Sequence, residues 1–497
     1  MESIGIPFYF GEESFHIIAP PTLVPTIEAA IKSLVPNATF GSGRTLHVKY
    51  RWDADGLTVS LLFAGAEQWN YSDREILDSR YGEVDRERRL KERVRLGVQR
   101  VLETSYNLRP SPWGILTGVR PTKLVHSLFD RGFSPDQVER TLLEVYALSH
   151  EKVELLLDVV ARQRPYFHSA PNNPISIYVG IPFCPTRCSY CSFAAYPLAS
   201  HGHLLKGFLG ALQTEINAVG SLIRELDLQV ETVYLGGGTP TTVQGGDLAA
   251  LLSQITSQLC TRETREFMVE AGRPETLTLE TLQILKDGGV QRISINPQTM
   301  HDDTLQTIGR EHSVQQVRTA FYRARQVGIP LINMDIILGL PGEQLEHVRH
   351  TLEEIGTLGP DNLTVHSLAL KRASRLKKSL EKIHIAQEQG EAMVTLARDY
   401  ALSWGMVPYY LYRQRHILGD LENIGYAKLG TDSIYNIQMM EERQTIIALG
   451  GGGITKLVSQ DLSLVRQANP KCPATYSHQM ANNLAEKLSR IREHFQG

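Results

Sequence analysis

The sequence contains little cysteine and no excess of positive charge. Its 497 residues include only 5 cysteines, an odd number that is too small for a disulfide-stabilised scaffold. Lys and Arg together number 51, and Asp and Glu 54, so the formal net charge is −3. This balance provides no basic arm for nucleic acid, and we expect no nucleic-acid partner.

Long apolar runs are missing as well. No stretch reaches the roughly 20 apolar residues of a membrane-spanning helix. The best candidate, residues 329–340, is interrupted by Asn333 and Asp335. Acidic residues precede Lys32, so the start of the chain does not resemble the basic start of a secretory signal. We therefore expect a protein without a membrane span, located in the reducing cytoplasm.

Residues 1–170 predict a separate α+β module. Residues 46–52 and 57–63 alternate in polarity around a turn-rich link, which is typical of a β-hairpin. Residues 72–105 predict a helix with a basic face. Acidic residues interrupt its Arg and Lys run, so we favour a solvated helix face over a nucleic-acid contact. The module contains no catalytic constellation.

From residue 175 onward, short apolar runs alternate with helical patterns. The repetition implies parallel strands joined by right-handed crossovers, in a partial α/β barrel of six units. We expect functional residues at the C-terminal ends of the strands. We divide the chain into the N-terminal accessory module (1–170), the barrel (171–370) and a C-terminal cover or substrate domain (371–497). The predicted strands are residues 175–179, 230–235, 266–270, 291–295, 331–337 and 363–368.

Three of the cysteines lie in one loop directly after the first predicted strand. Cys184, Cys188 and Cys191 have the spacing Cys-x3-Cys-x2-Cys. Soft thiolates suit an Fe–S cluster, zinc or Cu(I), and three ligands on a four-iron cluster leave one iron open for a small molecule. The alternative is a zinc site completed by His201 or His203. The spacing disfavours it, because no distant second cysteine pair follows.

Glycine and polar residues follow the later strands. Gly236-Gly-Gly-Thr239 ends the second strand, and three glycines allow a ligand to approach the backbone closely. Glu270, Gln298 and Asp335 lie at or near the ends of the third, fourth and fifth strands. Taken singly, each has an ordinary explanation as a tight turn or a hydrogen-bonded core residue. Together they predict a polar floor at the mouth of the barrel.

The cysteine loop after a first barrel strand resembles the radical S-adenosylmethionine (SAM) superfamily. The lead-in Tyr-x-x-Ile-Pro-Phe-Cys, the Gly-Gly-Gly-Thr-Pro-Thr turn and the Arg-Ile-Ser-Ile strand resemble the oxygen-independent coproporphyrinogen III oxidase (HemN-like) family. The similarity runs from about residue 175 to the C-terminus. Trp-Gly-Ile-Leu-Thr-Gly-Val-Arg-Pro-Thr-Lys and residues 409–415 and 421–426 are most similar to the HemZ-type subgroup. The resemblance implies a partial (β/α)6 TIM-like radical SAM barrel with an N-terminal α+β module and a mostly helical C-terminal domain.

The resemblance also implies cofactors and contacts. A [4Fe–4S] cluster would be held by Cys184, Cys188 and Cys191, and its open iron would bind SAM; the best-known branch holds two SAM molecules. Arg310, with Arg413 or Arg415, could hold substrate or cofactor carboxylates. Residues matching the family's SAM contacts are Tyr178, Gly237 and Glu270 for the first SAM, Tyr190, Gly238, Thr239, Gln298, Arg310, Asp335 and Ala369 for the second, and Ile454 as a looser match.

The implied activity is a step of haem biosynthesis. One electron from the reduced cluster would cleave SAM to a 5′-deoxyadenosyl radical, which takes hydrogen from a propionate of coproporphyrinogen III. Loss of CO2 and one further electron leaves a vinyl group, and two such events give protoporphyrinogen IX. The expected partners are this tetrapyrrole and an electron donor such as flavodoxin or ferredoxin.

Other activities within the superfamily remain open. A haem chaperone is one, although the His-Asn-x-x-Tyr-Trp signature of that group is absent from the C-terminal part. Methyl transfer to a tetrapyrrole and opening of a haem ring are others, because their initiating machinery would look alike. Gly180 and Phe193 stand where the best-known branch has a His and a fourth Cys. All three cluster ligands remain, so we expect the cluster to assemble. The two departures bear instead on protonation of the substrate and on turnover of the propionate step.

Overall fold

The structure is a computed structural model that divides the chain into two compact units, Met1–Leu157 and Asp158–Gly497. It describes residues 13–54, 56–65, 67–76, 80, 82–116, 118, 120–167, 174–191, 193–368, 387–413 and 421–496. Among these residues, no helix is long and apolar enough to cross a lipid bilayer. The division into 1–170, 171–370 and 371–497 stays a prediction.

The first unit is built on a five-stranded sheet with the order β2-β1-β3-β4-β5. The predicted hairpin is confirmed, because β3 and β4 pair antiparallel with Trp52 opposite Leu57. Helices α1 and α2 pack on the sheet over a core that includes Phe15, Ile27 and Val98. The elements are β1 (Ser14–Ile18), α1 (Val24–Leu34), β2 (Thr39–Phe40), β3 (Arg44–Trp52), β4 (Gly56–Ala64), β5 (Gln68–Ile76), α2 (Glu83–Ser105), α3 (Pro121–Asp130), α4 (Pro135–Arg140) and the first part of α5 (His150–Gln163), a helix that continues into the second unit.

The helix predicted over 72–105 begins at Glu83 instead, because Gln68–Ile76 forms strand β5. Residues of β5 alternate in direction, and Trp69 and Tyr71 pack against the core of the unit while β5 pairs with β4. The helix starts after Gly82, whose N–H donates to the Asp85 carboxylate at 3.2 Å. Tertiary pairing here overrides a charged sequence that locally resembles a helix.

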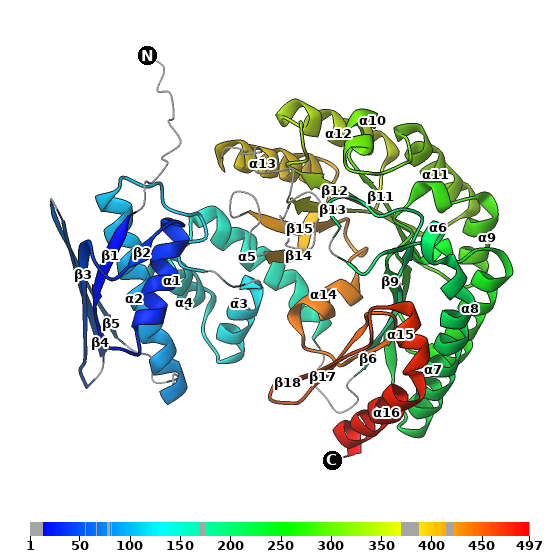
Figure 1. Ribbon diagram of the computed structural model, residues 1–497, viewed down its shortest axis with the longest axis horizontal. Helices are drawn as coiled ribbons and strands as arrows, with labels where there is room; N and C mark the ends of the chain where they lie inside the picture. Colours follow the sequence, from blue (N-terminus) through cyan, green and yellow to red (C-terminus); the bar gives the residue numbers. More distant parts are fainter. Residues whose placement is uncertain are drawn as a thin grey trace. The chain divides into compact units, whose positions relative to one another are not determined.

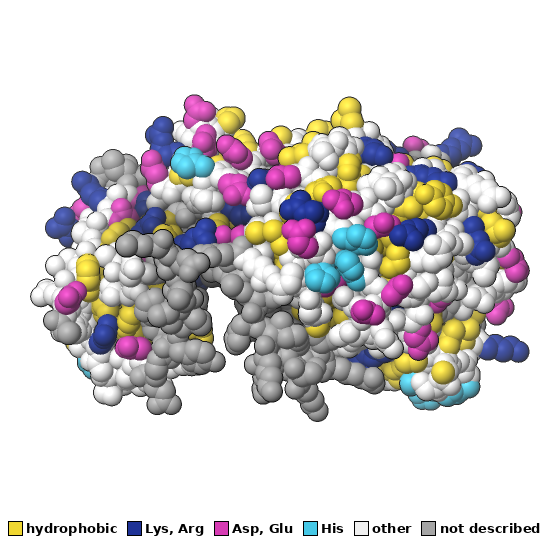
Figure 2. Space-filling view, turned by 90° about the horizontal axis from the view of Figure 1, so that it is seen from above, with side chains coloured by type: hydrophobic (Ala, Val, Ile, Leu, Met, Phe, Trp, Pro, Cys, Tyr) yellow, Lys and Arg dark blue, Asp and Glu magenta, His cyan; other side chains and the backbone are white. Residues whose placement is uncertain are grey.

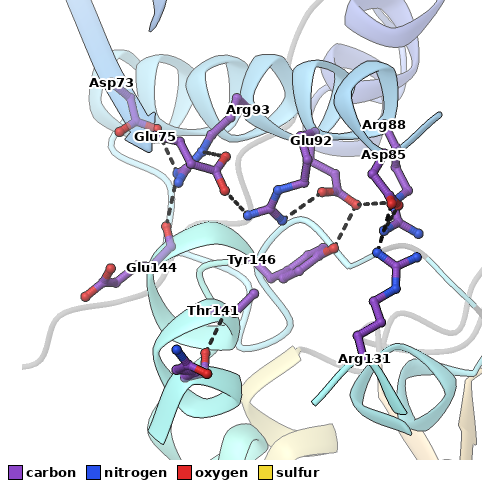
Figure 3. Close-up of polar contacts among 12 residues, drawn as sticks. Asp73, Glu75, Asp85, Arg88, Glu92, Arg93, Arg131, Thr141, Glu144 and Tyr146 are labelled. Atoms are coloured by element: carbon purple, nitrogen blue, oxygen red, sulfur yellow. Dashed lines mark hydrogen bonds and ion pairs between the residues drawn. The ribbon is translucent and has the colours of Figure 1, made fainter. Parts of the chain in front are cut away.

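The prediction of a solvated basic face on this helix is wrong for two of its arginines. Arg89 and Arg93 are 2% and 7% exposed, and both bond the carboxylate of Glu75 on β5. Figure 3 shows this network, in which Glu92 also accepts from the Tyr146 hydroxyl at 2.7 Å. The buried ion pairs tie α2 to the sheet, and the hydrogen bond from Tyr146 ties α2 to the segment that carries this tyrosine.

The second unit contains the predicted barrel. Six parallel strands lie in the order β13-β12-β11-β10-β9-β6, and each predicted apolar run corresponds to one of them. Figure 1 shows α7, α8, α9, α11 and α12 in an arc outside these strands. The elements are β6 (Ile175–Ile181), β7 (Phe183–Cys184), β8 (Tyr196–Pro197), α6 (Leu198–His201), α7 (Leu205–Glu225), β9 (Val230–Gly237), α8 (Gly245–Leu259), β10 (Glu266–Val269), α9 (Leu279–Asp287), β11 (Arg292–Gln298), α10 (Asp302–Thr307), α11 (Val314–Val327), β12 (Leu331–Leu338), α12 (Leu345–Leu358) and β13 (Asn362–Ser367).

The C-terminal part contributes strands to both edges of this sheet. Strands β15 and β14 extend it antiparallel beyond β13, while β16 pairs parallel to β6 and is followed by β17 and β18. The six-stranded barrel is therefore the centre of an 11-stranded sheet. The elements are α13 (Gln387–Ser403), β14 (Val407–Arg413), β15 (Glu422–Ala427), α14 (Ile434–Glu441), β16 (Ile446–Gly450), β17 (Ile454–Val458), β18 (Leu464–Ala468), α15 (Pro473–His478) and α16 (Met480–Gln496).

A buried ion pair attaches the C-terminal helix to the barrel. Lys487 on α16 is 1% exposed and donates to Glu215 on α7, which also accepts from the Tyr476 hydroxyl on α15 at 2.5 Å. The same carboxylate accepts the backbone N–H of Gly450 at 2.8 Å. Because every partner is supplied by the chain, we interpret this cluster as structural.

Charges of both signs are interspersed on the face of the molecule that Figure 2 shows. On the face seen in Figure 2, basic and acidic side chains of the described residues lie among one another rather than in separate fields. This distribution agrees with the near-neutral net charge of −3.

Candidate functional site

The cysteine loop leaves the C-terminal end of β6. Cys184 and Cys188 are 7% and 9% exposed, Cys191 is half-buried, and all three are free thiols. Backbone bonds hold the loop: the N–H of Tyr196 donates to Pro182 O at 2.9 Å, and that of Ser189 to Ile308 O at 3.0 Å. Burial raises the pKa of the Cys184 thiol to about 11, so a metal centre is needed to keep it as a thiolate at neutral pH.

The glycine turn after β9 packs directly against this loop. A Cβ on Gly238 would lie 2.5 Å from Phe183 O and 2.8 Å from Cys184 Sγ, so only glycine fits there. Gly237 has φ +116°, another conformation that favours glycine. The Thr239 hydroxyl, buried in the turn, donates to Cys184 Sγ at 3.5 Å. The predicted turn and the predicted cysteine loop therefore form one structure.

Two carboxylates lie in the barrel interior. Glu270, directly after β10, accepts the N–H of Gly237 at 3.3 Å. Burial raises its pKa from 4.5 to about 7, and the charge of Asp335 on β12 adds to the effect. Asp335 accepts from Asn333 at 2.6 Å and lies 3.6 Å from His366 Nε2. A pair of half-buried like charges favours a cationic ligand, which would lower the pKa of Glu270 again.

Aromatic rings line the interior next to Glu270. The rings of Tyr178 on β6 and Tyr234 on β9 stack at 6.0 Å and 19°. Tyr435, from α14, stacks on Tyr234 at 4.4 Å and 25°. The Tyr435 hydroxyl is buried and has no hydrogen-bond partner among the described residues. These rings place low-dielectric material beside the Glu270 carboxylate.

Arg310 is hydrogen-bonded to Tyr190, and both residues are predicted SAM contacts. Its Nε donates to the Tyr190 hydroxyl at 3.2 Å, and its Nη1 donates to Gly272 O at 3.2 Å and to Asn296 O at 2.5 Å. Arg310 is 8% exposed, and these bonds connect the cysteine loop to the loop after β10 and to strand β11.

Gln298 ends β11 with φ +69°, an uncommon conformation for a residue with a Cβ. Such strain clusters at ligand sites. Gln298 pairs with Ile336, next to Asp335. The neighbouring Asn296 Oδ1 is buried without a hydrogen-bond partner among the described residues. Backbone strain and an unpaired buried acceptor are features that cluster at ligand-binding sites.

The remaining predicted residues are dispersed or undescribed. Ile454 begins β17 and is 41% exposed, although the preceding Gly453 approaches Tyr178. Arg413 ends β14 and is 4% exposed. Ala369 and Arg415 lie outside the described residues.

Gly180 lies where two backbones meet. A Cβ on Gly180 would lie 2.7 Å from Gly451 O, while the Gly451 N–H donates to Gly180 O at 2.9 Å. A Cβ on Gly450 would come 2.2 Å from Gly180 O. A histidine at position 180, as in the best-known branch, therefore does not fit this backbone arrangement. Gly180 lies opposite Gly450 where β6 pairs with β16, a contact that we call the seam between β6 and β16.

Sequence reasoning missed three residues of the site. Arg273 donates to Cys188 Sγ at 3.3 Å, and its position three residues after Glu270 was the available signal. His366 is linked to Asp335 and, through Nδ1, to the Tyr412 hydroxyl at 3.2 Å. Tyr435 comes from a helix far along the chain, and no local pattern indicates its place in the ring stack.

The residues fit the cluster and SAM that the site pattern suggests. The donor set is three free thiols with a hydroxyl and a guanidinium donating to two of them. Among the described residues, no three His, Cys, Asp or Glu side chains converge on a single metal-ion position. A cubane needs no such convergence, because iron and sulfide separate its thiolates. His201, a possible zinc ligand, packs edge-on against Tyr196 at 5.1 Å.

Parallel strands with a three-thiol loop after the first and a glycine turn after the second define a radical SAM protein. The sequence model of the radical SAM superfamily matches residues 178–355. The chain is 41% identical over 393 residues to the oxygen-independent coproporphyrinogen-III oxidase-like protein HemZ of Bacillus subtilis, covering 77% of this chain and 78% of HemZ. The chain belongs to the HemN-like family of the radical SAM superfamily, a family that implies a [4Fe–4S] cluster and SAM.

Two further proteins are similar to this chain. The heme chaperone HemW of Bacillus subtilis is 31% identical over 272 residues, which cover 54% of this chain and 68% of HemW. The structure of coproporphyrinogen III oxidase (HemN) from Escherichia coli aligns with a TM-score of 0.51 at 20% identity, over 65% of this chain and 73% of that one. The latter similarity confirms the fold.

Proposed function

We propose that this protein oxidatively decarboxylates two propionates of coproporphyrinogen III to vinyl groups without oxygen, giving protoporphyrinogen IX. The proposal rests on one observation. The glycine turn contacts both the cysteine loop and the Glu270 carboxylate at one end of the barrel. The extensive similarity to a coproporphyrinogen-III oxidase-like protein supports the choice of substrate.

We assign the cluster to Cys184, Cys188 and Cys191. The proposed SAM contacts are Tyr178, Gly237 and Glu270 for the first molecule, Tyr190, Gly238, Thr239, Gln298, Arg310, Asp335 and Ala369 for a second, with Ile454 at the edge. When bound, the cluster and SAM supply a 5′-deoxyadenosyl radical for hydrogen abstraction.

The chain's own residues bind, orient and exclude water. The Thr239 hydroxyl and the Gly237 N–H fix the cysteine loop and the Glu270 carboxylate relative to one another. Glu270 and Asp335 attract the cationic sulfonium and ammonium groups of SAM into the barrel. The tyrosine stack keeps water away from the reacting atoms.

The substrate is tested by anaerobic reconstitution with iron and sulfide, followed by incubation with SAM, a reductant and coproporphyrinogen III. We expect 5′-deoxyadenosine together with a porphyrinogen that has lost two molecules of CO2, both identified by mass spectrometry. Formation of 5′-deoxyadenosine with an unchanged tetrapyrrole would contradict this substrate. A methylated or ring-opened tetrapyrrole would assign one of the other superfamily reactions.

The similarity to a heme chaperone supports a second candidate function. A chaperone would bind haem stoichiometrically and pass it on without consuming SAM. Titration of the reconstituted protein with haem, followed by the Soret band, separates the two functions. Tight one-to-one binding without decarboxylation would favour the chaperone.

A further inference from the structure

We propose that Arg273 is a positioning residue that donates a hydrogen bond to the Cys188 thiolate and raises the reduction potential of the cluster. The inference rests on the proposed cluster at the three cysteines and goes beyond it by naming a residue that adjusts its redox equilibrium.

The guanidinium of Arg273 contacts the cysteine loop at two residues. It is 3% exposed in the loop that follows β10. Its Nη1 lies 3.3 Å from Cys188 Sγ, within hydrogen-bond reach of sulfur. Its Nη2 donates to the Thr186 hydroxyl at 2.8 Å, and Nη1 reaches Thr186 O at 3.5 Å. The planar fork of arginine is therefore aligned along the loop, with one nitrogen directed at a ligand sulfur.

Glu275 holds this arginine from behind, and His312 lies against the other oxygen of Glu275. Arg273 Nε and Nη2 lie 2.7 and 2.6 Å from Glu275 Oε1, and His312 Nδ1 lies 3.2 Å from Glu275 Oε2. Burial alone would raise the pKa of Glu275, but His312 and Arg273 outweigh it and hold the pKa at about 2. Glu275 is thus an anion at neutral pH, and the charged arginine has a fixed partner on the side away from the sulfur.

Two of the three ligands, Cys184 and Cys188, therefore differ in their donors. Cys184 receives a neutral hydroxyl from Thr239 at 3.5 Å, whereas Cys188 receives a cationic N–H. Reduction adds negative charge that spreads onto the ligand sulfurs. Hydrogen bonds and positive charge at those sulfurs stabilise the reduced state and raise the potential.

The test is an anaerobic, EPR-monitored redox titration of the full-length reconstituted protein without SAM. Arg273→Met keeps the side-chain length and removes the charge and the donors. We expect at least a tenfold shift of the equilibrium toward the oxidised cluster, which is 59 mV lower for one electron. Arg273→Lys, which keeps the charge and loses the fork, should give an intermediate potential.

Arg318→Met is the matched control. Arg318 pairs with Glu354 at 2.6 Å on the helical surface, so this substitution changes the charge equally without touching the cysteine loop. We expect its potential to equal that of the unmodified protein. If Arg273→Met loads too little cluster to titrate, Arg273→Gln is measured instead, with the same expectation.

The outcomes separate this inference from the proposed function. A fully loaded Arg273→Met cluster with an unchanged potential would overturn the role of Arg273 and leave the cluster assignment standing. Failure of the unmodified protein to assemble an iron–sulfur cluster would overturn the proposed function itself. A lower potential in Arg273→Met, with an unchanged one in Arg318→Met, is the result that the contacts predict.

Discussion

At the scale of single residues, Glu270 has a raised pKa, a neighbouring carboxylate and a hydrogen bond from the glycine turn. It is half-buried beside a second carboxylate, Asp335, and its pKa of about 7 lies well above the ordinary 4.5. The folded protein therefore binds a proton at this site between about pH 4.5 and 7 that the unfolded chain releases. This site favours folding below that range, and its contribution is lost as the pH rises through 7.

Glu270→Gln should remove that pH dependence. In the reduced protein without cluster or SAM, we expect the variant to be more stable than the unmodified protein at pH 8, by at most about 3 kcal/mol, and the difference to shrink toward pH 4.5. Chemical denaturation across this pH range measures it. Glu263→Gln, on an exposed loop, is the control and should follow the unmodified curve. A constant difference at every pH would contradict the pKa.

At the scale of elements, the seam between β6 and β16 explains a departure from the family pattern. Gly180 and Gly450 approach one another so closely that neither position has room for a side chain. The cysteine loop starts immediately after β6, so the position of this strand determines where the loop lies. The glycine at position 180 is therefore a requirement of packing in this chain.

Gly180→Ala should destabilise the protein because the new Cβ would meet the Gly451 carbonyl oxygen at 2.7 Å. We expect a loss of about 1–3 kcal/mol in the free energy of unfolding. Gly210→Ala is a matched control, since nothing lies within 4 Å of that Cβ on α7 and alanine suits a helix. Equal stability of the two variants in chemical denaturation would show that the seam can relax.

At this scale, the strands that could be predicted from the sequence are those that are buried. Strands such as β6 and β9 are buried on both faces and are largely apolar in sequence, so they are predictable. Strand β5 is polar, and its place in a sheet depends on pairing with β4, so the sequence alone predicts helix from residue 72 onward. The cysteine spacing indicated the ligands, but His312 and Tyr435 reach the site through the tertiary fold alone.

At the scale of the whole molecule, each compact unit has its own core and its own buried ion pairs. In the first unit, Glu75 accepts from both Arg89 and Arg93. Removing one partner of such a pair leaves charge buried without compensation, which costs far more than losing a surface pair. Damage to this network should therefore affect the first unit specifically.

Glu75→Ala tests this expectation. It should lower the stability of the first unit by about 3–5 kcal/mol, seen as an earlier transition in a calorimetric scan. The EPR spectrum of the reconstituted cluster should not change. Glu87→Ala, which removes an exposed ion pair with Lys91, should leave both measurements unaltered. Loss of the cluster signal in folded Glu75→Ala would contradict the division into separate cores.

The central claim is that the cysteine loop holds a radical-generating cluster. The most direct test measures iron, sulfide and SAM cleavage in three reconstituted proteins: the unmodified chain, Cys188→Ala and Cys260→Ala. Cys260 caps α8, away from the loop, and controls for the loss of a thiol. We predict iron, sulfide and 5′-deoxyadenosine in the unmodified protein and in Cys260→Ala, and no 5′-deoxyadenosine from Cys188→Ala. SAM cleavage by Cys188→Ala, or zinc in place of iron in the unmodified protein, would contradict the claim.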